Sequence, residues 1–408
     1  MTRELRIGLQ PDCRLLFAAR IARMFAYGLI SVILVFYLET VGVSTRLIGI
    51  LLSLTLLGDT AVSLWMTTAA DRLGRRRMLI AGGGLMLFAG VLFGLTSQFT
   101  WLLIAAIIGV ISPSGYEVGP FLAIEQAALS QEIAQTERTR IFAWYNLSGS
   151  FATAIGAFAA GHFSGALQHM GVTPLNSYRT ILFAYALIGG VLCLLFSRLS
   201  QAVEPSKSEA AVAKNRFGLH NSHGVVMKLS ALFGLDAFAG GFVIQSIVAY
   251  WFHCRFGADL STLGSIFFGA NLLAGLSSLA SAWVASRIGL VNTMVFTHLP
   301  SNILLILVPF MPTLPWAVGL LLARFSISQM DVPPRQAYTM AVVAPDERSA
   351  AAGITGIART IGAALSPAIA GALLASPSFL SAPFVLGGLL KVIYDLLLYR
   401  NFQKHIPL

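Results

Sequence analysis

Long apolar runs follow one another along almost the whole chain, and they restrict its possible folds more than any other feature. The hydrocarbon core of a bilayer is about 30 Å thick, so about 20 mostly apolar residues cross it as a helix. Hydrophobic residues make up 56% of the 408 positions and charged residues 11%, a composition that excludes an ordinary soluble domain. The sequence predicts an all-α membrane protein with twelve spans, at residues 15–38, 47–69, 78–97, 101–130, 140–163, 179–198, 228–252, 262–285, 292–311, 315–342, 350–374 and 379–400.

Lysines and arginines are distributed unevenly between the two sides of this predicted topology. With the amino terminus in the cytoplasm, cytoplasmic segments hold eighteen of the 27 lysines and arginines, and outer connections hold three. This positive-inside pattern predicts a multi-pass protein of the cell inner (plasma) membrane with both termini cytoplasmic. The net charge of +10 then reflects topology and contact with anionic membrane lipid, and nucleic acid is not expected as a partner. No cleavable signal peptide is expected, because the first run carries Arg20 and Arg23.

The two halves of the chain resemble each other in sequence. A shift of 210 residues places Gln126 on Gln336 and Glu125 on Arg335. The segment 201–227 between the halves is rich in Ser, Ala, Lys and Glu, which is typical of a solvated linker. The chain is therefore predicted to form two six-helix bundles, residues 1–200 and 228–408, with a cytoplasmic linker between them.

A short basic loop joins the second and third predicted spans. It resembles the signature loop of the major facilitator superfamily, Gly-x-x-x-Asp-Arg-x-Gly-Arg-Arg, which is matched here by Asp71, Arg72, Gly74, Arg75 and Arg76. The resemblance implies the fold of that superfamily, with twelve helices in two pseudo-symmetric bundles and the substrate path at their seam.

The charge cluster at the inner end of the second span predicts a cytoplasmic gate made by Asp71, Arg72, Gly74 and Arg75 together with Glu125 and Arg335. We expect Asp71 to cap the amino-terminal end of helix eleven, where the helix dipole is positive. Arg75 is expected to pair with Glu125 at the inner end of helix four. The alternative for Glu125 and Arg335 is that they only brace the loops.

A second pattern concerns the direction of transport. Members of the superfamily that export drugs or metabolites against protons carry Gly-x-x-x-Gly-Pro-x-x-Gly-Gly in helix five. The aligned positions here are Ala152, Gly156, Ala157, Ala160 and Gly161, without the proline, and the copy around Pro367 in helix eleven matches better. The chain thus resembles the proton-coupled exporter branch. The alternative is that these small residues only let helices pack closely.

Ionisable residues inside the spans are the candidates for function, because each costs about 2.5–3.5 kcal/mol at a helix centre on insertion scales. In this superfamily helices one, four, seven and ten line the central cavity, and we expect salt bridges across the seam between the bundles. Converging arginines favour a carboxylate, a phosphate or another oxyanion as ligand. The candidate substrate-binding residues are Arg20, Arg23, Tyr27, Gln245, Arg324 and Arg359.

Asp59 lies about halfway along the second span among apolar residues, where burial opposes ionisation. It is the first candidate for carrying a coupling proton, with Arg359 expected as its fixed countercharge. The alternative is a carboxyl group satisfied by Ser63 or by a neighbouring helix. The further candidates for proton coupling are Glu117, Asp236 and Asp331.

Proline and glycine residues predict where spans bend. Helix four contains Pro113 and Pro120, and helix ten contains Pro333 and Pro334. In helix seven, a bend at Gly240-Gly241 is needed to bring both Asp236 and Gln245 to the cavity.

These observations together predict a secondary transporter that exports a small molecule in exchange for protons by alternating access. The alternatives are a proton-coupled importer of a small anionic or zwitterionic solute and, less favoured, a membrane receptor without transport. An enzyme is not expected, because the seven histidines form no catalytic or metal-binding motif. The three cysteines suggest neither a disulfide framework nor a metal site, so no cofactor or metal is predicted. The expected partners of a monomeric protein are the solute, protons and membrane lipids.

Overall fold

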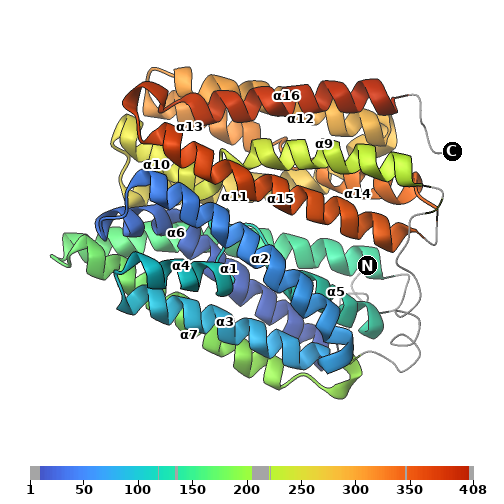
Figure 1. Ribbon diagram of the computed structural model, residues 1–408, viewed down its shortest axis with the longest axis horizontal. Coiled ribbons are helices and arrows are strands. Elements are labelled where there is room, and N and C mark those ends of the chain that lie inside the picture. The colour runs from blue at the N-terminus through green and yellow to red at the C-terminus, as the bar shows by residue number, and fades with distance from the viewer. Residues whose placement is uncertain are drawn as a thin grey trace, which may run out of the picture.

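The computed structural model describes residues 10–117, 119–133, 137–204, 220, 222–344 and 347–403, except for the side chains of Asp71, Thr139 and Ser349. Helices account for most of these residues and form two bundles side by side (Figure 1). The helices of the first half are α1 Pro11–Thr40, α2 Thr45–Leu73, α3 Arg75–Leu95, α4 Phe99–Ile108, α5 Phe121–Glu132, α6 Arg138–His169 and α7 Pro174–Ser197. Those of the second half are α9 His223–Gly241, α10 Gln245–Phe256, α11 Leu260–Ile288, α12 Leu290–Leu307, α13 Leu314–Phe325, α14 Val332–Ala341, α15 Arg348–Leu374 and α16 Ala382–Phe402. Three short 3-10 turns, η1 Gln201–Val203, η2 Val308–Phe310 and η3 Pro377–Phe379, complete the description.

The predicted internal repeat is confirmed by the way the helices pack. In the amino-terminal bundle α1 packs on α6 and α3 on α7, and in the carboxy-terminal bundle α9 packs on α15 and α12 on α16. The seam is made by α6 against α11 and by α2 against α15. Figure 1 shows α2 and α15 side by side between the two bundles. The linker predicted at 201–227 lies mostly outside the described residues, and α9 begins within that range.

Three of the twelve predicted spans are divided into two half-helices. Among the described residues, nine helical stretches are long and apolar enough to cross a membrane, and α9 with α10 counts as one of them. The fourth span divides into α4 and α5, the seventh into α9 and α10, and the tenth into α13 and α14. The predicted bends in helices four, seven and ten are thereby confirmed. Such breaks are tolerated in membranes where the freed backbone groups are buried in protein or line a cavity.

The break in helix ten differs in detail from the prediction. Pro333 and Pro334 do not bend a continuous helix, because the chain leaves the helix at Ser326 and the two prolines lie in the first turn of α14. Proline is well accommodated there, since a first-turn N–H has no partner within the helix.

Large apolar side chains cover the outer surface of the bundles. Trp65 is 61% exposed on α2 and Leu187 is 68% exposed on α7. In water such a surface would be unfavourable, and in a bilayer it faces acyl chains. Polar and charged side chains such as Arg23 and Asp236 are instead buried between the helices.

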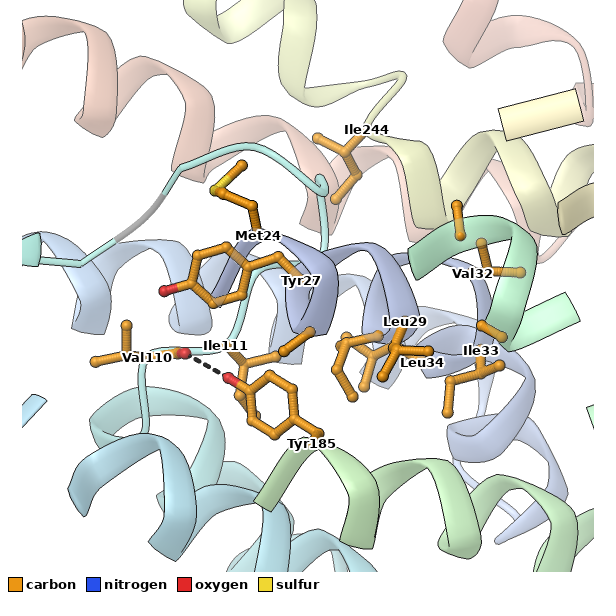
Figure 2. Close-up of a cluster of buried hydrophobic side chains, with 14 of the residues drawn as sticks. Met24, Tyr27, Leu29, Val32, Ile33, Leu34, Val110, Ile111, Tyr185 and Ile244 are labelled. Atoms are coloured by element: carbon orange, nitrogen blue, oxygen red, sulfur yellow. Dashed lines mark hydrogen bonds between the residues drawn. The ribbon is translucent and has the colours of Figure 1, made fainter. Parts of the chain in front are cut away.

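The core of the amino-terminal bundle surrounds the first span (Figure 2). Tyr27 is fully buried there, and Tyr185 on α7 donates a hydrogen bond of 2.7 Å to the carbonyl oxygen of Val110. That carbonyl lies just beyond the end of α4, so the tyrosine satisfies a backbone acceptor freed by the break.

The small residues of the exporter-like pattern bring helices into close contact. Gly156 approaches the backbone of Gly28 within the amino-terminal bundle, and Gly161 approaches Gly264 across the seam. Gly371 meets Gly49 across the seam in the same way. These contacts account for the pattern by packing, independently of the direction of transport.

The contact between Gly49 and Gly371 should be required to close one end of the seam. A Cβ on Gly371 would lie 2.7 Å from the Cα of Gly49 and from the carbonyl oxygen of Thr45, too close for any side chain. We predict that Gly371→Val increases labelling of an Ile247→Cys reporter on α10 by a membrane-impermeant maleimide. Ile247 is only 3% exposed and lies at the same contact.

The matched control is Gly190→Val on α7, where a Cβ would meet no atom within 4 Å. Equal labelling of the reporter in the two variants would contradict the prediction.

Candidate functional site

A cluster of ion pairs joins helix one to helix four in the amino-terminal bundle. Arg23 binds Glu125 through two hydrogen bonds of 2.6 and 2.7 Å, and its Nε donates to Glu117 at 2.9 Å. Arg20 donates to the other oxygen of Glu117 at 2.7 Å. Tyr145 on α6 also donates to Glu125. Two guanidinium groups and two carboxylates are thus neutralised within one bundle.

Residues 109–117, 119 and 120 lie outside helices between α4 and α5 and are called the unwound segment here. This segment carries Glu117 and reaches several other helices. Gly115 and Gly119 have φ values of +72° and +83°, which favour glycine. The N–H of Gly119 donates a hydrogen bond of 3.0 Å to Asp59 Oδ2 on α2. The other oxygen, Asp59 Oδ1, is buried without a hydrogen-bond partner among the described residues, and so is the hydroxyl of Ser63. The alternative in which Ser63 satisfies Asp59 is therefore wrong.

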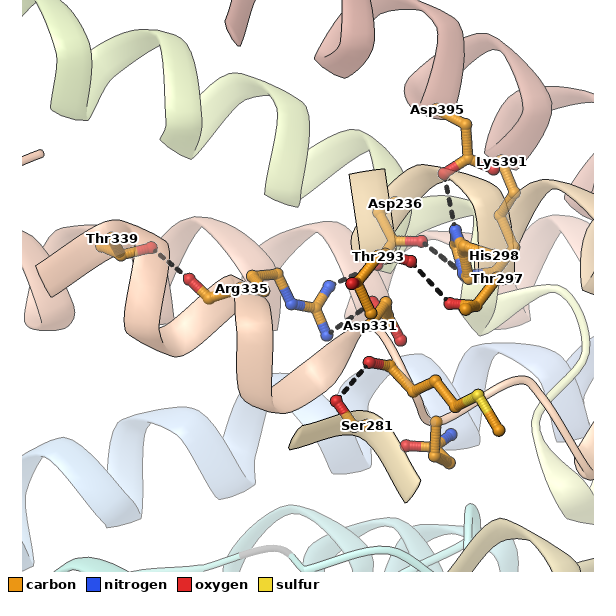
Figure 3. Close-up of polar contacts among 12 residues, drawn as sticks. Asp236, Ser281, Thr293, Thr297, His298, Asp331, Arg335, Thr339, Lys391 and Asp395 are labelled. Atoms are coloured by element: carbon orange, nitrogen blue, oxygen red, sulfur yellow. Dashed lines mark hydrogen bonds and ion pairs between the residues drawn. The ribbon is translucent and has the colours of Figure 1, made fainter. Parts of the chain in front are cut away.

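A second cluster occupies the carboxy-terminal bundle (Figure 3). Asp236 on α9 binds Arg335 on α14 at 2.8 Å and Lys391 on α16 at 2.5 Å. Asp331, at the amino-terminal end of α14, lies 3.5 Å from Arg335. This cluster also neutralises its charges inside its own bundle.

The two clusters are related by the repeat with their charges reversed. Glu125 corresponds to Arg335, and the partner on the first helix of each bundle is Arg23 in one and Asp236 in the other. Each bundle therefore ties its first span to the second half of its broken fourth span by one buried ion pair.

Three predicted contacts are wrong. No salt bridge crosses the seam among the described ion pairs, because every one of these pairs joins side chains of the same bundle. Arg75 does not pair with Glu125, which is turned into the bundle toward Arg23. Arg359 does not contact Asp59 and lies in electrostatic range of Asp236 and Asp331 instead.

The basic loop is anchored to its own bundle. The carboxylate of Glu204 accepts hydrogen bonds from the backbone N–H groups of Arg75 at 2.7 Å and Arg76 at 3.2 Å. Arg75 also donates to the carbonyl oxygen of Val203 at 3.3 Å. Gly74 has φ +102° and joins α2 directly to α3, while the Arg72 side chain is exposed. The side chain of Asp71 lies outside the described residues, so its predicted capping of helix eleven stays a prediction.

A cavity of about 120 Å³ lies on the seam beside the unwound segment. Tyr116 from that segment and Gln329 from the break between α13 and α14 meet across it, with 3.4 Å between the phenol oxygen and the amide nitrogen. Most of the other lining side chains are neutral hydrogen-bonding groups, and the full lining is Met24, Gly115, Tyr116, Ser150, Thr153, Asn271, Ala274, Ser278 and Gln329.

Two arginines near this seam have no ion-pair partner among the described residues. Arg324, in the last turn of α13, stacks over Phe325 and lies in electrostatic range of Tyr116. Its Nε has no hydrogen-bond partner among those residues, and the same holds for the Nε of Arg359 on α15. Of the predicted substrate-binding arginines, these two are available to a ligand, whereas Arg20 and Arg23 are occupied by carboxylates.

One end of the seam is closed by hydrogen bonds between the bundles. Gln245 donates to Ser31 at 2.8 Å and accepts from Asn271 at 3.1 Å. Ser246 donates from its hydroxyl to the carbonyl oxygen of Pro113 at 2.6 Å. Gln245 therefore belongs to this closure, and Tyr27 is buried in the amino-terminal bundle rather than in the lining of the cavity.

Several polar residues of the carboxy-terminal cluster were missed by the sequence analysis. His298 on α12 binds Asp395 on α16 at 2.8 Å, and Asn302 donates to the same carboxylate at 2.8 Å. Lys391 contacts Asp236 from α16. The spacing of these residues in the sequence could have revealed them. His298 and Asn302 lie four residues apart inside one apolar run, and Lys391 and Asp395 lie four residues apart inside another, so each pair falls on one helix face.

Two pseudo-symmetric helical bundles with broken spans, a seam cavity and one closed end are the architecture of a membrane transporter. The family model for the Major Facilitator Superfamily matches residues 16–367, and the chain belongs to this superfamily. A relative in Saccharomyces cerevisiae, the uncharacterized membrane protein YJR124C, is 30% identical over 421 residues, covering 96% of this chain and 94% of that protein.

Solved structures of transporters share the fold. A bacterial homolog of the human lysosomal transporter Spinster has a TM-score of 0.75 at 15% identity, over 97% of this chain and 98% of that chain. The nucleoside transporter NupG, as its D323A mutant, has a TM-score of 0.73 at 13% identity, over 96% and 99%. The human organic anion transporter MFSD10 has a TM-score of 0.61 at 16% identity, over 95% and 100%.

Removing one member of the Arg23 and Glu125 pair should unfold the protein at lower temperature. Both side chains are fully buried, and breaking a buried ion pair by replacing one partner costs about 3–5 kcal/mol. We predict a large fall in the thermal unfolding temperature of Glu125→Gln in detergent. Glu137→Gln is the control, because its pair with Arg140 is exposed and worth about 0–1 kcal/mol. Similar shifts in both variants would contradict the prediction.

Proposed function

We propose that this protein is a proton-coupled secondary transporter that carries a small organic anion across the membrane by alternating access. The observation that carries the proposal is the seam cavity, which lies between the broken spans of both bundles and is closed toward one end by Gln245 and Ser246. In the predicted topology the closed end faces outward. Opening the seam at one end and closing it at the other would move a bound solute.

Export is the proposed direction, with proton-coupled import as the alternative. The support is the resemblance of helices five and eleven to the exporter pattern. The small residues of this pattern also let the helices pack closely. The proposed setting is the inner (plasma) membrane, with a monomer surrounded by lipid and both termini in the cytoplasm.

Asp59 is the proposed carrier of the coupling proton. One carboxylate oxygen is held by the N–H of Gly119, and the other has no partner among the described residues. A bare carboxylate oxygen in an apolar bundle favours the protonated form. Loss of the proton would strengthen the bond to Gly119 and so change the position of the unwound segment. Glu117 and Asp331 are less suited to this role, because each already lies against an arginine.

Recognition of the solute is assigned to the neutral cavity lining and to Arg324. An unpaired guanidinium in electrostatic range of Tyr116 would bind a carboxylate or phosphate in a bidentate manner. Arg359 is the second available cation. Arg20 and Arg23 hold the bundle together, so the earlier assignment of these two residues to substrate binding is replaced by a structural role.

The proposed cytoplasmic gate includes the basic loop, which is now held by hydrogen bonds within its own bundle. Arg75 and Arg76 are held by Glu204 within the amino-terminal bundle. Closing the cytoplasmic end would bring Asp71, Arg72 and Arg75 toward helix eleven, with Glu125 and Arg335 fixing the inner half-helices.

Proton flux driven by a solute gradient tests the proposed function. Purified protein in proteoliposomes is supplied with a monocarboxylate, a dicarboxylate, a sugar phosphate or a nucleoside, while a pH-sensitive dye reports the lumen. The nucleoside is included because a nucleoside transporter is among the structural neighbours. At least one anion should drive a pH change that empty liposomes lack. A solute that is transported without moving protons would contradict the proposed coupling.

Asp59→Asn should separate proton coupling from solute binding. The amide mimics the protonated carboxyl group, so uptake driven by a pH gradient should be lost while counterflow of the solute continues. Both assays use inverted membrane vesicles and the solute identified by proton flux. Full uptake driven by a pH gradient in Asp59→Asn would rule out this carboxylate as the coupling site.

Lysine substitutions should distinguish the two kinds of arginine. Lysine lacks the planar fork of the guanidinium group. Arg324→Lys is expected to raise the apparent KM for the anion several-fold with an unchanged unfolding temperature. Arg23→Lys is expected to lower the unfolding temperature, because it cannot satisfy Glu117 and Glu125 together. Normal transport by Arg324→Lys would remove the anion assignment.

A further inference from the structure

A buried polar layer behind Asp236 has no part in the transport cycle described so far. His298 lies between two carboxylates, with its Nδ1 2.8 Å from Asp395 Oδ1 and its Nε2 3.8 Å from Asp236 Oδ1 (Figure 3). Lys391 on α16 contacts the same oxygen of Asp236. His298 is 5% exposed and Asp395 is fully buried. This arrangement connects α9, α12 and α16.

The fold does not require such a layer at this position. The equivalent helix pair of the amino-terminal bundle, α3 and α7, meets through small residues, with Gly90 against Ala186 and Gly83 against Gly189. Replacing a buried ion pair by well-packed apolar side chains is often neutral or stabilising. The polar layer is therefore an asymmetry between the two bundles that packing does not explain.

We propose that His298 is a second proton-binding site, and that its charge controls how firmly Asp236 holds Arg335. The inference deepens the proposed proton-coupled function and rests on it. The charged and titratable groups that face His298 or its partner carboxylates are Asp236 from α9, Asp331 and Arg335 from the amino-terminal end of α14, Arg359 from α15, and Lys391, Tyr394 and Asp395 from α16.

The hydrogen bonds around the imidazole define the protonation step. Asn302 donates to Asp395 Oδ2, and Asp395 Oδ1 lies 2.8 Å from His298 Nδ1. We infer that Nδ1 carries the proton of the neutral ring, because a carboxylate oxygen can only accept. In the neutral ring the lone pair of Nε2 then faces Asp236 Oδ1 at 3.8 Å. A proton arriving from water binds that lone pair, so one N–H bond forms and no protein bond breaks. The ring becomes a cation with an N–H directed at Asp236.

Protonation of His298 is expected to affect α14, the inner half of the broken tenth span. Before protonation, Asp236 shares its charge between Lys391 and Arg335. A third cation on the side of α12 and α16 draws the carboxylate away from Arg335 and weakens that bond. Arg335 lies on α14, a half-helix of ten residues. Protonation of His298 is thus expected to loosen α14 from α9 and shift the conformational equilibrium.

Pulsed electron paramagnetic resonance can measure this shift with protons as the only ligand. Spin labels are attached at Ala123→Cys on α5 and Ala337→Cys on α14, both at exposed positions, after replacement of Cys13, Cys193 and Cys254. The protein in nanodiscs is measured between about pH 5 and about pH 8, where an imidazole changes charge. The distance distribution of the otherwise unchanged protein should change with pH, and His298→Gln should lose most of that change.

Asp59→Asn separates this site from the coupling carboxylate. In an Asp59→Asn background a pH response should remain, and adding His298→Gln should remove it. His162→Gln on the surface of α6 is the control and should respond like the parent protein. Asp395→Asn gives an independent test if His298→Gln does not fold, because it removes the charge that orients the imidazole and should also flatten the response.

A folded His298→Gln protein that keeps the full pH response in the Asp59→Asn background would overturn the inference. The pH response of the spin-label distance could depend on His298 even if solute uptake needs no proton gradient. That result would support the inference about His298 and contradict the proposed proton coupling. The two failures are therefore distinguishable.

Discussion

The rest of the structure depends on the complete neutralisation of Arg23 inside the amino-terminal bundle. A guanidinium buried between membrane helices is tolerated only when its donors and its charge are both matched. Here Glu125 takes two donors and Glu117 takes the third. Glu125 comes from the regular helix α5, but Glu117 comes from the unwound segment. The chain must therefore leave the helix in the middle of the fourth span for Arg23 to be satisfied.

That unwound segment connects the charges to the seam. Its carbonyl at Pro113 accepts from Ser246 of the other bundle, and its Tyr116 meets Gln329 across the cavity. Its Gly119 binds Asp59 on α2. A change of charge at Asp59 and a change of contact at the seam would both act on the same short stretch of backbone. This stretch is the physical route for the coupling proposed above.

Much of the fold could be predicted from the sequence. The length of the apolar runs and the charge of the loops depend on local composition, so the twelve spans and the internal repeat could be predicted. The prolines and glycines indicated where three of the spans break. The pairing of the charges could not be predicted, because it depends on which face each helix turns to its neighbour. Glu125 was expected at the inner surface beside Arg75, yet the rotation of α5 directs it to Arg23. His298 was overlooked because a single histidine in an apolar run gives a weak signal, and its meaning depends on Asp395 nearly a hundred residues later.

The central claim is that transport requires the closed end of the seam to open. The most direct measurement is transport by a protein with a disulfide across that end. Ser53 on α2 accepts a hydrogen bond of 2.9 Å from the backbone N–H of Ala368 on α15, so Ser53→Cys with Ala368→Cys would bridge the bundles. Oxidation of this pair should stop solute-driven proton flux, and reduction should restore it. Undiminished flux with the cross-link fully formed would show that the closed end need not open.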